Sequence, residues 1–447
     1  METAVDFLLE RFRAAGEKTA FVEADGRSES YTDLIERIER LRVALREAGL
    51  RPGAAVQLRG DFSAASAAWL IALWAEGGIV TPLAPVSCEK AGEFVTVADV
   101  EWIVEAEANI PQRGPGQSHH ALYDNLREAG DPGLIIFSSG TTGASKGALH
   151  NVRKLLGKFR APGKDFTTLA FLLFDHIAGI DTLLYCLANG STIVCPGARS
   201  PAEVSRLVEH YRVEVLPVAP SFLNILLMSG AHEGRDLSSL KIITYGAEMM
   251  PQGLLDRVAE AFPAVRIVQK YGTSEIGALR SQSDGNRSRW LRLGGSGTEW
   301  RAVDGLLEIR TPTAMLGYLN APSPFTGDGW YKTGDRVEVE DDLVRFLGRD
   351  SDMINVGGQK VFPAEVEAAI REIEGVAEVA VFGKPHPILG ATVCARIRMQ
   401  DSALAAAEVR TRIRQGLAGR LEPYKIPQKI EVTQETLTTE RFKQRRG

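Results

Sequence analysis

The sequence predicts an α/β protein with a large N-terminal domain, built of several subdomains with mostly parallel sheets and a small β unit, and a small α+β C-terminal domain. Short apolar runs alternate with segments whose apolar residues recur at helical spacing, and this alternation is typical of parallel sheets flanked by helices. From Gly305 the pattern changes to short strands punctuated by glycines, which indicates antiparallel pairing. The 447 residues suffice for about three structural units.

The elements are predicted in chain order. A helix over residues 30–48 is predicted, with Thr32 and Asp33 as candidate caps and Gly49 at its end. The apolar stretch 64–74 is too short to span a bilayer and predicts a buried helix. Strands of the large domain are expected at 55–58, 79–83, 134–137, 169–173, 193–194, 213–218, 242–245 and 267–268, and those of the β unit at 306–309 and 337–346. After a domain boundary at Arg349/Asp350 we expect helices at 364–373 and 403–417 and strands at 379–382, 394–397 and 430–432.

Composition excludes several classes of protein. Lys and Arg total 52 against 57 Asp and Glu, a net charge of −5, and long basic runs are missing, which argues against nucleic acid as the main partner. The four cysteines have no C-x-x-C spacing, so neither a zinc site nor a disulfide framework is indicated. Charged residues run through the first 50 positions, so we expect no secretory leader. A cytoplasmic protein without membrane insertion, monomeric or homodimeric, is predicted.

A loop rich in hydroxyls and glycines follows the strand at 134–137. It reads Ser138-Ser139-Gly140-Thr141-Thr142-Gly143-Ala144-Ser145-Lys146-Gly147. Glycines let backbone N–H groups approach phosphate oxygens, hydroxyls add donors and a lysine adds a charge, so polyphosphate binding is predicted. A P-loop is excluded because Gly143 and Lys146 are not adjacent. By itself, such a run is also consistent with a flexible surface loop.

Together with other motifs in the same order, this loop resembles the signature of the adenylate-forming superfamily: acyl- and aryl-CoA synthetases, peptide-synthetase adenylation domains and beetle luciferases. The other matching segments are Tyr245-Gly246-Ala247-Glu248, Gln269-Lys270-Tyr271-Gly272-Thr273-Ser274-Glu275, Gly317-Tyr318, Tyr331-Lys332-Thr333-Gly334-Asp335, Gly348-Arg349-Asp350-Ser351-Asp352, residues 356–361 and residues 365–367. They cover nearly the whole chain, and the closest likeness is to acyl- or aryl-CoA ligases. Ser274 stands where Thr is usual.

The resemblance implies an N-terminal AMP-binding domain over residues 1–349 and a C-terminal lid over 350–447. The nucleotide-binding residues it implies are Ser138, Ser139, Gly140, Thr141, Thr142, Gly143, Lys146, Gly246, Ala247, Glu248, Tyr271, Gly272, Thr273, Ser274, Asp335, Arg349 and Lys443. Asp335 would accept hydrogen bonds from the ribose with Arg349 assisting, Tyr271 would offer its ring to adenine, and Glu275 would hold Mg²⁺. Taken without the other motifs, Asp335 is also consistent with an Asx-turn residue, Tyr271 with a core tyrosine and Glu275 with a solvated carboxylate.

The implied catalytic residues are Lys443, Thr142 and Glu275. Lys443 would bridge the substrate carboxylate and the α-phosphate, although Leu437 and Phe442 replace the Pro and Gly usual nearby, and a disordered basic tail is the alternative. Residues implied to bind the acid are Asp175, His176, Ile177, Tyr245, Gly246, Gly272 and Ile276, and His176 is equally consistent with a core histidine. Gly357, Gly358 and Lys360 would line a channel for a thiol acceptor, and Ser351 occupies the hinge position.

The activity implied is ATP-dependent conversion of an acyl or aryl carboxylic acid to an acyl-adenylate with release of pyrophosphate, then transfer to a thiol, that of CoA. ATP, Mg²⁺ and CoA are therefore the expected cofactors and co-substrates. Transfer to a carrier-protein phosphopantetheine thiol, transfer to an amine, and a non-catalytic nucleotide- or acyl-binding module remain alternatives. The segment 85–131 is shorter than the corresponding segment of stand-alone synthetases. This shortening affects the expected CoA contacts and the expected depth of the acid pocket.

Overall fold

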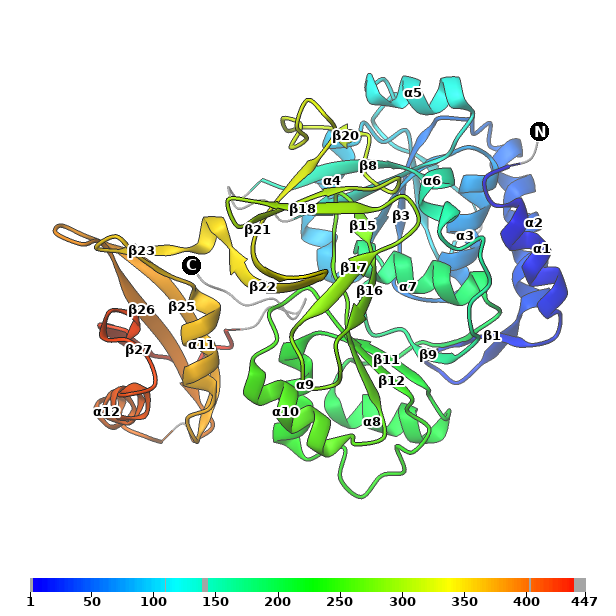
Figure 1. Cartoon of the computed structure of the whole chain (residues 1–447). Coiled ribbons are helices and arrows are strands. Elements are labelled where there is room, and N and C mark those ends of the chain that lie inside the picture. The colour runs from blue at the N-terminus through cyan, green and yellow to red at the C-terminus, as the bar shows by residue number, and fades with distance from the viewer. Residues whose placement is uncertain (1–2, 109, 139–143, 402, 438–447) are drawn as a thin grey trace.

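The computed structural model describes residues 3–108, 110–138, 144–401 and 403–437, and Figure 1 shows them as a large α/β body followed by a smaller block. The helices of the body are α1 (Asp6–Ala15), α2 (Tyr31–Glu47), α3 (Ala64–Ala75), α4 (Ala91–Val97), α5 (Leu122–Ala129), α6 (Val152–Gly157), α7 (Ile177–Ala188), α8 (Pro201–His210), α9 (Pro220–Ser229) and α10 (Gln252–Ala261), with a 3₁₀ turn at Pro85–Lys90. The predicted α/β class is confirmed.

Two mostly parallel sheets form the body. The first has the order β13 (Arg266–Gln269), β12 (Ile242–Tyr245), β11 (Val215–Val218), β9 (Thr167–Leu169), β10 (Thr192–Val194), β1 (Thr19–Val22) and β2 (Ser28–Ser30). The second has the order β20 (Gly317–Tyr318), β8 (Lys146–Asn151), β7 (Gly133–Ser138), β4 (Ile79–Leu83), β3 (Ala55–Arg59), β5 (Trp102–Glu105) and β6 (Gln112–Arg113). Antiparallel pairing is confined to β2 in the first sheet and to β20, β8 and β6 in the second.

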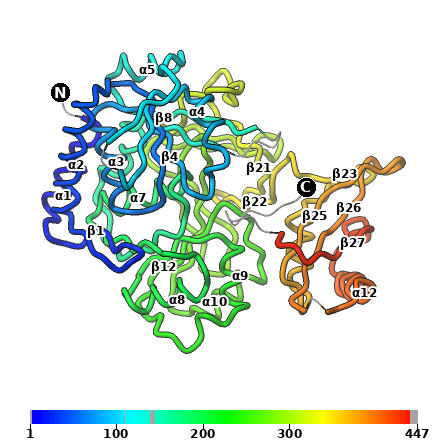
Figure 2. The backbone as a smooth tube through the Cα atoms, turned by 180° about the vertical axis from the view of Figure 1, so that it is seen from behind, coloured from blue at the N-terminus to red at the C-terminus, as the bar shows by residue number. Residues whose placement is uncertain are grey.

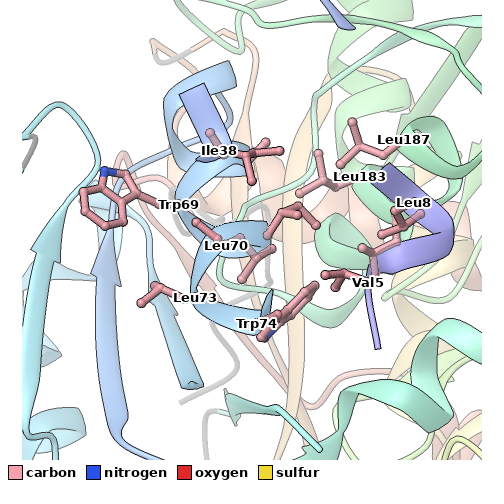
Figure 3. Close-up of a cluster of buried hydrophobic side chains, with 14 of the residues drawn as sticks. Val5, Leu8, Ile38, Trp69, Leu70, Leu73, Trp74, Leu183 and Leu187 are labelled. Atoms are coloured by element: carbon pink, nitrogen blue, oxygen red, sulfur yellow. The ribbon is translucent and has the colours of Figure 1, made fainter. Parts of the chain in front are cut away.

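The main core lies where α3 meets α1, α2 and α7 (Figure 3). Residues Ala64 to Trp74 of α3 are all buried, as the sequence predicts, and the indole N–H of Trp74 donates to the carbonyl of Gly133 at 3.0 Å. In the described part of the chain, no helix combines the length and apolarity needed to cross a membrane. The start of α2 differs in detail from expectation, because Ser30 is the N-cap and forms a capping box with Asp33.

The antiparallel unit is larger than predicted and begins well before Gly305. Its strands are ordered β16 (Arg280–Ser283), β17 (Leu291–Gly294), β22 (Leu343–Arg349), β21 (Tyr331–Glu340), β19 (Leu306–Arg310) and β18 (Glu299–Val303). The single strand expected at 337–346 was wrong: it is a hairpin of β21 and β22 that turns at Asp341, whose φ is 53°. Aspartate tolerates this left-handed conformation without the glycine that would have marked the turn. A short hairpin, β14 (Gly272–Thr273) and β15 (Gly277–Ala278), precedes the unit.

The C-terminal block follows β22 after a 3₁₀ turn at Asp350–Asp352. Its sheet contains β23 (Ile354–Val356), β24 (Gln359–Val361), β25 (Val376–His386), β26 (Gly390–Met399) and β27 (Lys429–Val432), with α11 (Pro363–Arg371), α12 (Ala406–Leu417) and a 3₁₀ turn at Pro423–Lys425. Its hydrophobic core starts at Ile354 and is separate from the cores of the body. Seen from behind, the block lies at the end of the molecule opposite α1 and α2 (Figure 2).

Candidate active site

A cavity of about 790 Å³ lies between the body and the C-terminal block. The body contributes the loop after β12, the loop after β13 and the β21–β22 hairpin, and the block contributes α11 and Lys360. Of the residues that the sequence predicts for the site, the lining contains Ala247, Glu248, Tyr271, Gly272, Thr273, Asp335, Arg349 and Lys360. Motifs that are far apart in the sequence therefore meet at one cleft.

A buried carboxylate, Asp335 of β21, lies at the body side of this cleft. Tyr271 donates its hydroxyl to Asp335 Oδ2 at 2.6 Å, and Arg349 Nε contacts Asp335 Oδ1 at 2.8 Å. The Arg349 guanidinium also donates to the carbonyl of Thr333 at 2.7 Å, and the Tyr271 ring stacks on Phe346 at 4.4 Å. Burial raises the pKa of Asp335, opposed by the charge of Arg349 and the hydroxyl of Tyr271. We refer to Tyr271, Asp335 and Arg349 as the carboxylate clamp.

A second buried carboxylate, Glu275, is surrounded by hydroxyl groups. Tyr318 donates to Glu275 Oε1 at 2.6 Å, and the side chains of Thr273 and Tyr331 also hydrogen-bond the carboxylate. Burial by itself would raise the pKa of Glu275, but these three hydrogen bonds outweigh it and lower the pKa. Glu275 is therefore an ionised carboxylate with a fixed orientation, held by donors that carry no charge.

The predicted phosphate loop joins β7 and β8, which form an antiparallel hairpin with Ser138 opposite Lys146. Ser139, Gly140, Thr141, Thr142 and Gly143 lie outside the described residues. At the start of β8, the Lys146 ammonium lies 5.6 Å from the centre of the Tyr318 ring, and the Tyr318 hydroxyl donates to Glu275. Lys146, which ends the predicted loop, therefore lies beside the hydroxyl cluster around Glu275.

The residues predicted for acid binding lie mostly away from the cavity lining. Asp175 is buried and accepts a hydrogen bond from Ser87, and His176 Nε2 lies 4.0 Å from Asp175 Oδ1 at the start of α7. Tyr245 is in the core with its hydroxyl 3.2 Å from Gln269, and Ile276 is fully buried. Ile177 is half-buried against the main core. Gly272 alone of this predicted set lines the cavity.

The remaining motif residues adjoin the cleft. Gly246 and Ser274 directly precede Ala247 and Glu275, and the carbonyl of Ser274 is 2.6 Å from His150 Nε2. Gly357 and Gly358 form the two-residue turn between β23 and β24 with φ of 59° and 88°, a conformation that strongly favours glycine. Ser351 is exposed in the 3₁₀ turn after β22 and donates to Asp352 at 3.1 Å. Lys443 and Phe442 lie outside the described residues.

Sequence reasoning missed three groups that hold the site together. Tyr318 and Tyr331 were quoted within motifs without a role, yet both bind Glu275. His150 is fully buried on β8 and contacts the carbonyls of Ser274 and Thr313, and burial lowers its pKa. An isolated histidine in an apolar strand gives no signal of this contact, because its partners lie more than 120 residues further along the chain.

The architecture is that of the adenylate-forming enzymes. The structure superposes on that of an anthranilate CoA ligase solved with anthranoyl-AMP, with a TM-score of 0.83 and 21% identity over 100% of this chain and 96% of the other. At that identity the likeness concerns the fold.

Family models agree with the fold. Residues 8–319 match the AMP-binding enzyme model and residues 365–443 match the AMP-binding enzyme C-terminal domain. The chain therefore belongs to the AMP-binding enzyme family.

Characterised relatives are CoA ligases. A (methyl-dioxo-octahydro-indenyl)propanoyl:CoA ligase of Rhodococcus jostii is 30% identical over 67% of this chain, a match that spans 58% of that enzyme's length. A 2-succinylbenzoate–CoA ligase of Listeria monocytogenes is 26% identical over 96% of this chain and 95% of its own length.

Proposed function

We propose that the chain activates a carboxylic acid with ATP, forming an acyl-adenylate and pyrophosphate, and then transfers the acyl group to the thiol of CoA. The observation that carries this proposal is the carboxylate clamp: a buried aspartate, held on one side by a tyrosine hydroxyl and on the other by an arginine, that lines the interdomain cleft. A fixed carboxylate is an acceptor suited to a pair of ribose hydroxyls. The relatives named above are CoA ligases, which supports CoA as acceptor.

Adenylation brings together two anions, a carboxylate and a triphosphate, so the enzyme must place cations and donors between them. We assign the ribose to Asp335 and Arg349, adenine to the surfaces of Tyr271, Ala247 and Glu248, and the β- and γ-phosphates to the loop from Ser138 to Lys146. Lys443 is assigned the contact with the substrate carboxylate and the α-phosphate. Oriented in this way, a carboxylate oxygen attacks the α-phosphorus and pyrophosphate leaves.

Mg²⁺ fits the residues around Glu275. Mg²⁺ is usually bound by one or two carboxylates together with substrate phosphates rather than by an all-protein cage. Glu275 supplies one ionised, pre-oriented carboxylate, and the described residues contain no cluster of three or more His, Cys, Asp or Glu side chains that could hold a metal alone. When bound, the ion would offset phosphate charge as the α-phosphate is attacked. Thr273, Tyr318 and Tyr331 would keep Glu275 aimed at that position.

For the second half-reaction we propose a domain boundary at Arg349/Asp350, with residues 1–349 as the AMP-binding domain and 350–447 as the lid. Rotation about Ser351 would withdraw Lys443 and bring the turn at Gly357 and Gly358, with Lys360, to the acyl-adenylate. The 3₁₀ turn at Asp350–Asp352 contains no buried residue, so it can change conformation without disturbing either core. A cytoplasmic location and a monomeric or homodimeric state stay predictions.

Carboxylate-dependent exchange of pyrophosphate into ATP tests the proposal. With Mg²⁺ and a broad panel of acyl and aryl acids, we expect exchange with at least one acid, and thioester detectable by mass spectrometry after CoA is added. Loss of exchange on omitting Mg²⁺ would support the requirement for this ion. A folded protein without exchange across the panel would refute the enzymatic proposal and favour a binding module. Exchange with thioester only on a holo-carrier protein, or with amide only on an amine, would reassign the acceptor.

A further inference from the structure

Lys270 precedes Tyr271 and has no role in the site described above. Its backbone lies at the end of β13, where its N–H donates to the carbonyl of Tyr245 at 2.7 Å, and the residue, which is exposed, is part of the cleft lining beside Gly272. Gly246 faces this position closely: a Cβ there would lie 2.9 Å from the Lys270 carbonyl oxygen. Glycine at 246 therefore allows the β12 and β13 loops to approach each other at this wall of the cleft.

The charges around Lys270 leave its ammonium without a counter-ion. Its charged neighbours are Asp181 on α7, Lys158, Arg266 and Arg280. Asp181, the one carboxylate among them, is already in an ion pair with Lys158. Within the described ranges, the Lys270 side chain has no hydrogen bond or ion pair, and partial desolvation at the cleft wall together with the neighbouring cations lowers its pKa.

Three other cations that line the cleft have carboxylate partners. Arg349 is paired with Asp335, Arg345 with Glu338, and Lys425 with Glu365. Lys270 differs from these three, because a partner for its charge would have to come from outside the described residues. An unpaired cation at the wall of a binding cleft is a feature that an anionic ligand group stabilises.

The cation cluster adjoins the wall expected to contact the acid. Lys158 donates to the carbonyl of Ala278 at 2.8 Å, and Ala278 pairs with Gly272 across the β14–β15 hairpin. Gly272 lines the cavity and belongs to the residues predicted for acid binding. The carboxylate clamp and Glu275 account for the proposed nucleotide end, whereas Lys270 has Asp181 of α7 among its charged neighbours and is left for a different part of a bound ligand.

We propose that the acid activated by this enzyme carries a second carboxylate, remote from the reacting one, and that Lys270 is its counter-ion. The proposal rests on the proposed function and names its substrate class as dicarboxylic acids. A charge-assisted hydrogen bond to a carboxylate in a partly buried site favours binding by about 10- to 100-fold over the uncharged analogue. The reacting carboxylate remains at the nucleotide end, so the two carboxylates lie at opposite ends of the bound acid.

The test uses matched pairs of acids that differ only in the distal carboxylate: pentanoate and glutarate, hexanoate and adipate, 4-phenylbutanoate and 4-(2-carboxyphenyl)butanoate. For each pair, kcat/KM in pyrophosphate exchange is measured with the full chain and with Lys270→Ala, Lys270→Arg and Lys241→Ala. Lys241 is the matched control, an exposed lysine on the same sheet, paired with Glu214 and outside the cavity lining. Binding of each acid with ATP is followed in parallel by the shift in melting temperature.

We expect the unmodified chain to prefer the dicarboxylate of at least one pair by tenfold or more. Lys270→Ala should reduce the ratio to within threefold of unity, Lys270→Arg should retain most of it, and Lys241→Ala should leave it unchanged. An unmodified chain that prefers every monocarboxylate, or a Lys270→Ala variant that keeps the ratio, overturns the proposal. If no acid supports exchange, the proposed function fails, and the melting-temperature comparison still decides whether Lys270 selects dicarboxylates.

Discussion

The two ends of the cleft are built in contrasting ways. At the nucleotide end, Asp335 and Glu275 are buried and each is held by several directed hydrogen bonds. At the lid end, Lys360 is exposed and the adjoining turn relies on two glycines with positive φ. A site with fixed donors stabilises a transition state without reorganising, whereas a surface that must arrive and leave cannot be fixed. The contrast matches the proposed function, in which adenylation uses the rigid end and acyl transfer the adaptable one.

The largest expected effect concerns Lys443, because it should serve the first half-reaction only. Replacing it with alanine removes a cation that offsets the charge of both reacting anions, so pyrophosphate exchange should fall by about 100-fold or more. Thioester formation from supplied acyl-adenylate and CoA should persist at nearly the unmodified rate. Both rates are measured by quenched-flow with mass spectrometry. Equal loss in both reactions would show that the lysine was misassigned.

Asp335→Ala tests the rigid end directly. The substitution removes the ribose acceptor and leaves Arg349 without its ion pair, so we expect KM for ATP to rise by about 30- to 100-fold. Asp342→Ala is the control, since Asp342 is an exposed residue at the turn of the same hairpin, paired with Arg292. Steady-state exchange kinetics measure the change. An unaltered KM for ATP in Asp335→Ala would remove the carboxylate clamp from the nucleotide site.

Tyr318→Phe tests how Glu275 is kept ionised. The hydroxyl is one of the donors that lower the pKa of Glu275, so its loss should raise that pKa. A lowered pKa keeps the carboxylate charged down to a more acidic pH, and its advantage is lost as pH falls through the folded-state pKa. The acidic limb of the exchange rate against pH should therefore move to higher pH. At pH 5, the Mg²⁺ concentration that gives half the maximal exchange rate should rise by about tenfold. An unmoved limb would assign it to another group.

Gly358→Ala probes the adaptable end and should have the smallest effect. A Cβ at Gly358 meets no atom within 4 Å, so the cost is backbone strain of about 1 kcal/mol in the free energy of unfolding. We expect acyl transfer to CoA to slow by about threefold to tenfold while exchange is unchanged. Gly419→Ala is matched, with φ of +77° and open space, but lies away from the cleft. Equal slowing in both variants would indicate a stability effect only.

The sequence predicts elements better than contacts. The buried helix α3 and the strands of the C-terminal block follow from local apolar patterns, which depend on neighbours a few residues away. The hairpin turn at Asp341 was missed because no glycine or proline marks it. At the site, the motifs identify Tyr271, Asp335 and Glu275, but not that Tyr271 binds Asp335 or that Tyr318 binds Glu275, since each pair is distant in sequence and is brought together by packing. Lys270 carries no pattern of its own, and only its surroundings reveal its unpaired charge.

The contact of Leu437 with the C-terminal block sets the effective concentration of Lys443 at the cleft. Leu437 is buried, lines the cleft and donates its backbone N–H to Glu378 on β25. Lys443 is six residues further on, and covalent geometry limits its reach from Leu437 to about 20 Å. A tethered group within such a radius is present at millimolar levels or above. Because the anchor belongs to the block, the proposed rotation of that block would carry the anchor of Lys443 with it and lower this local concentration at the nucleotide end.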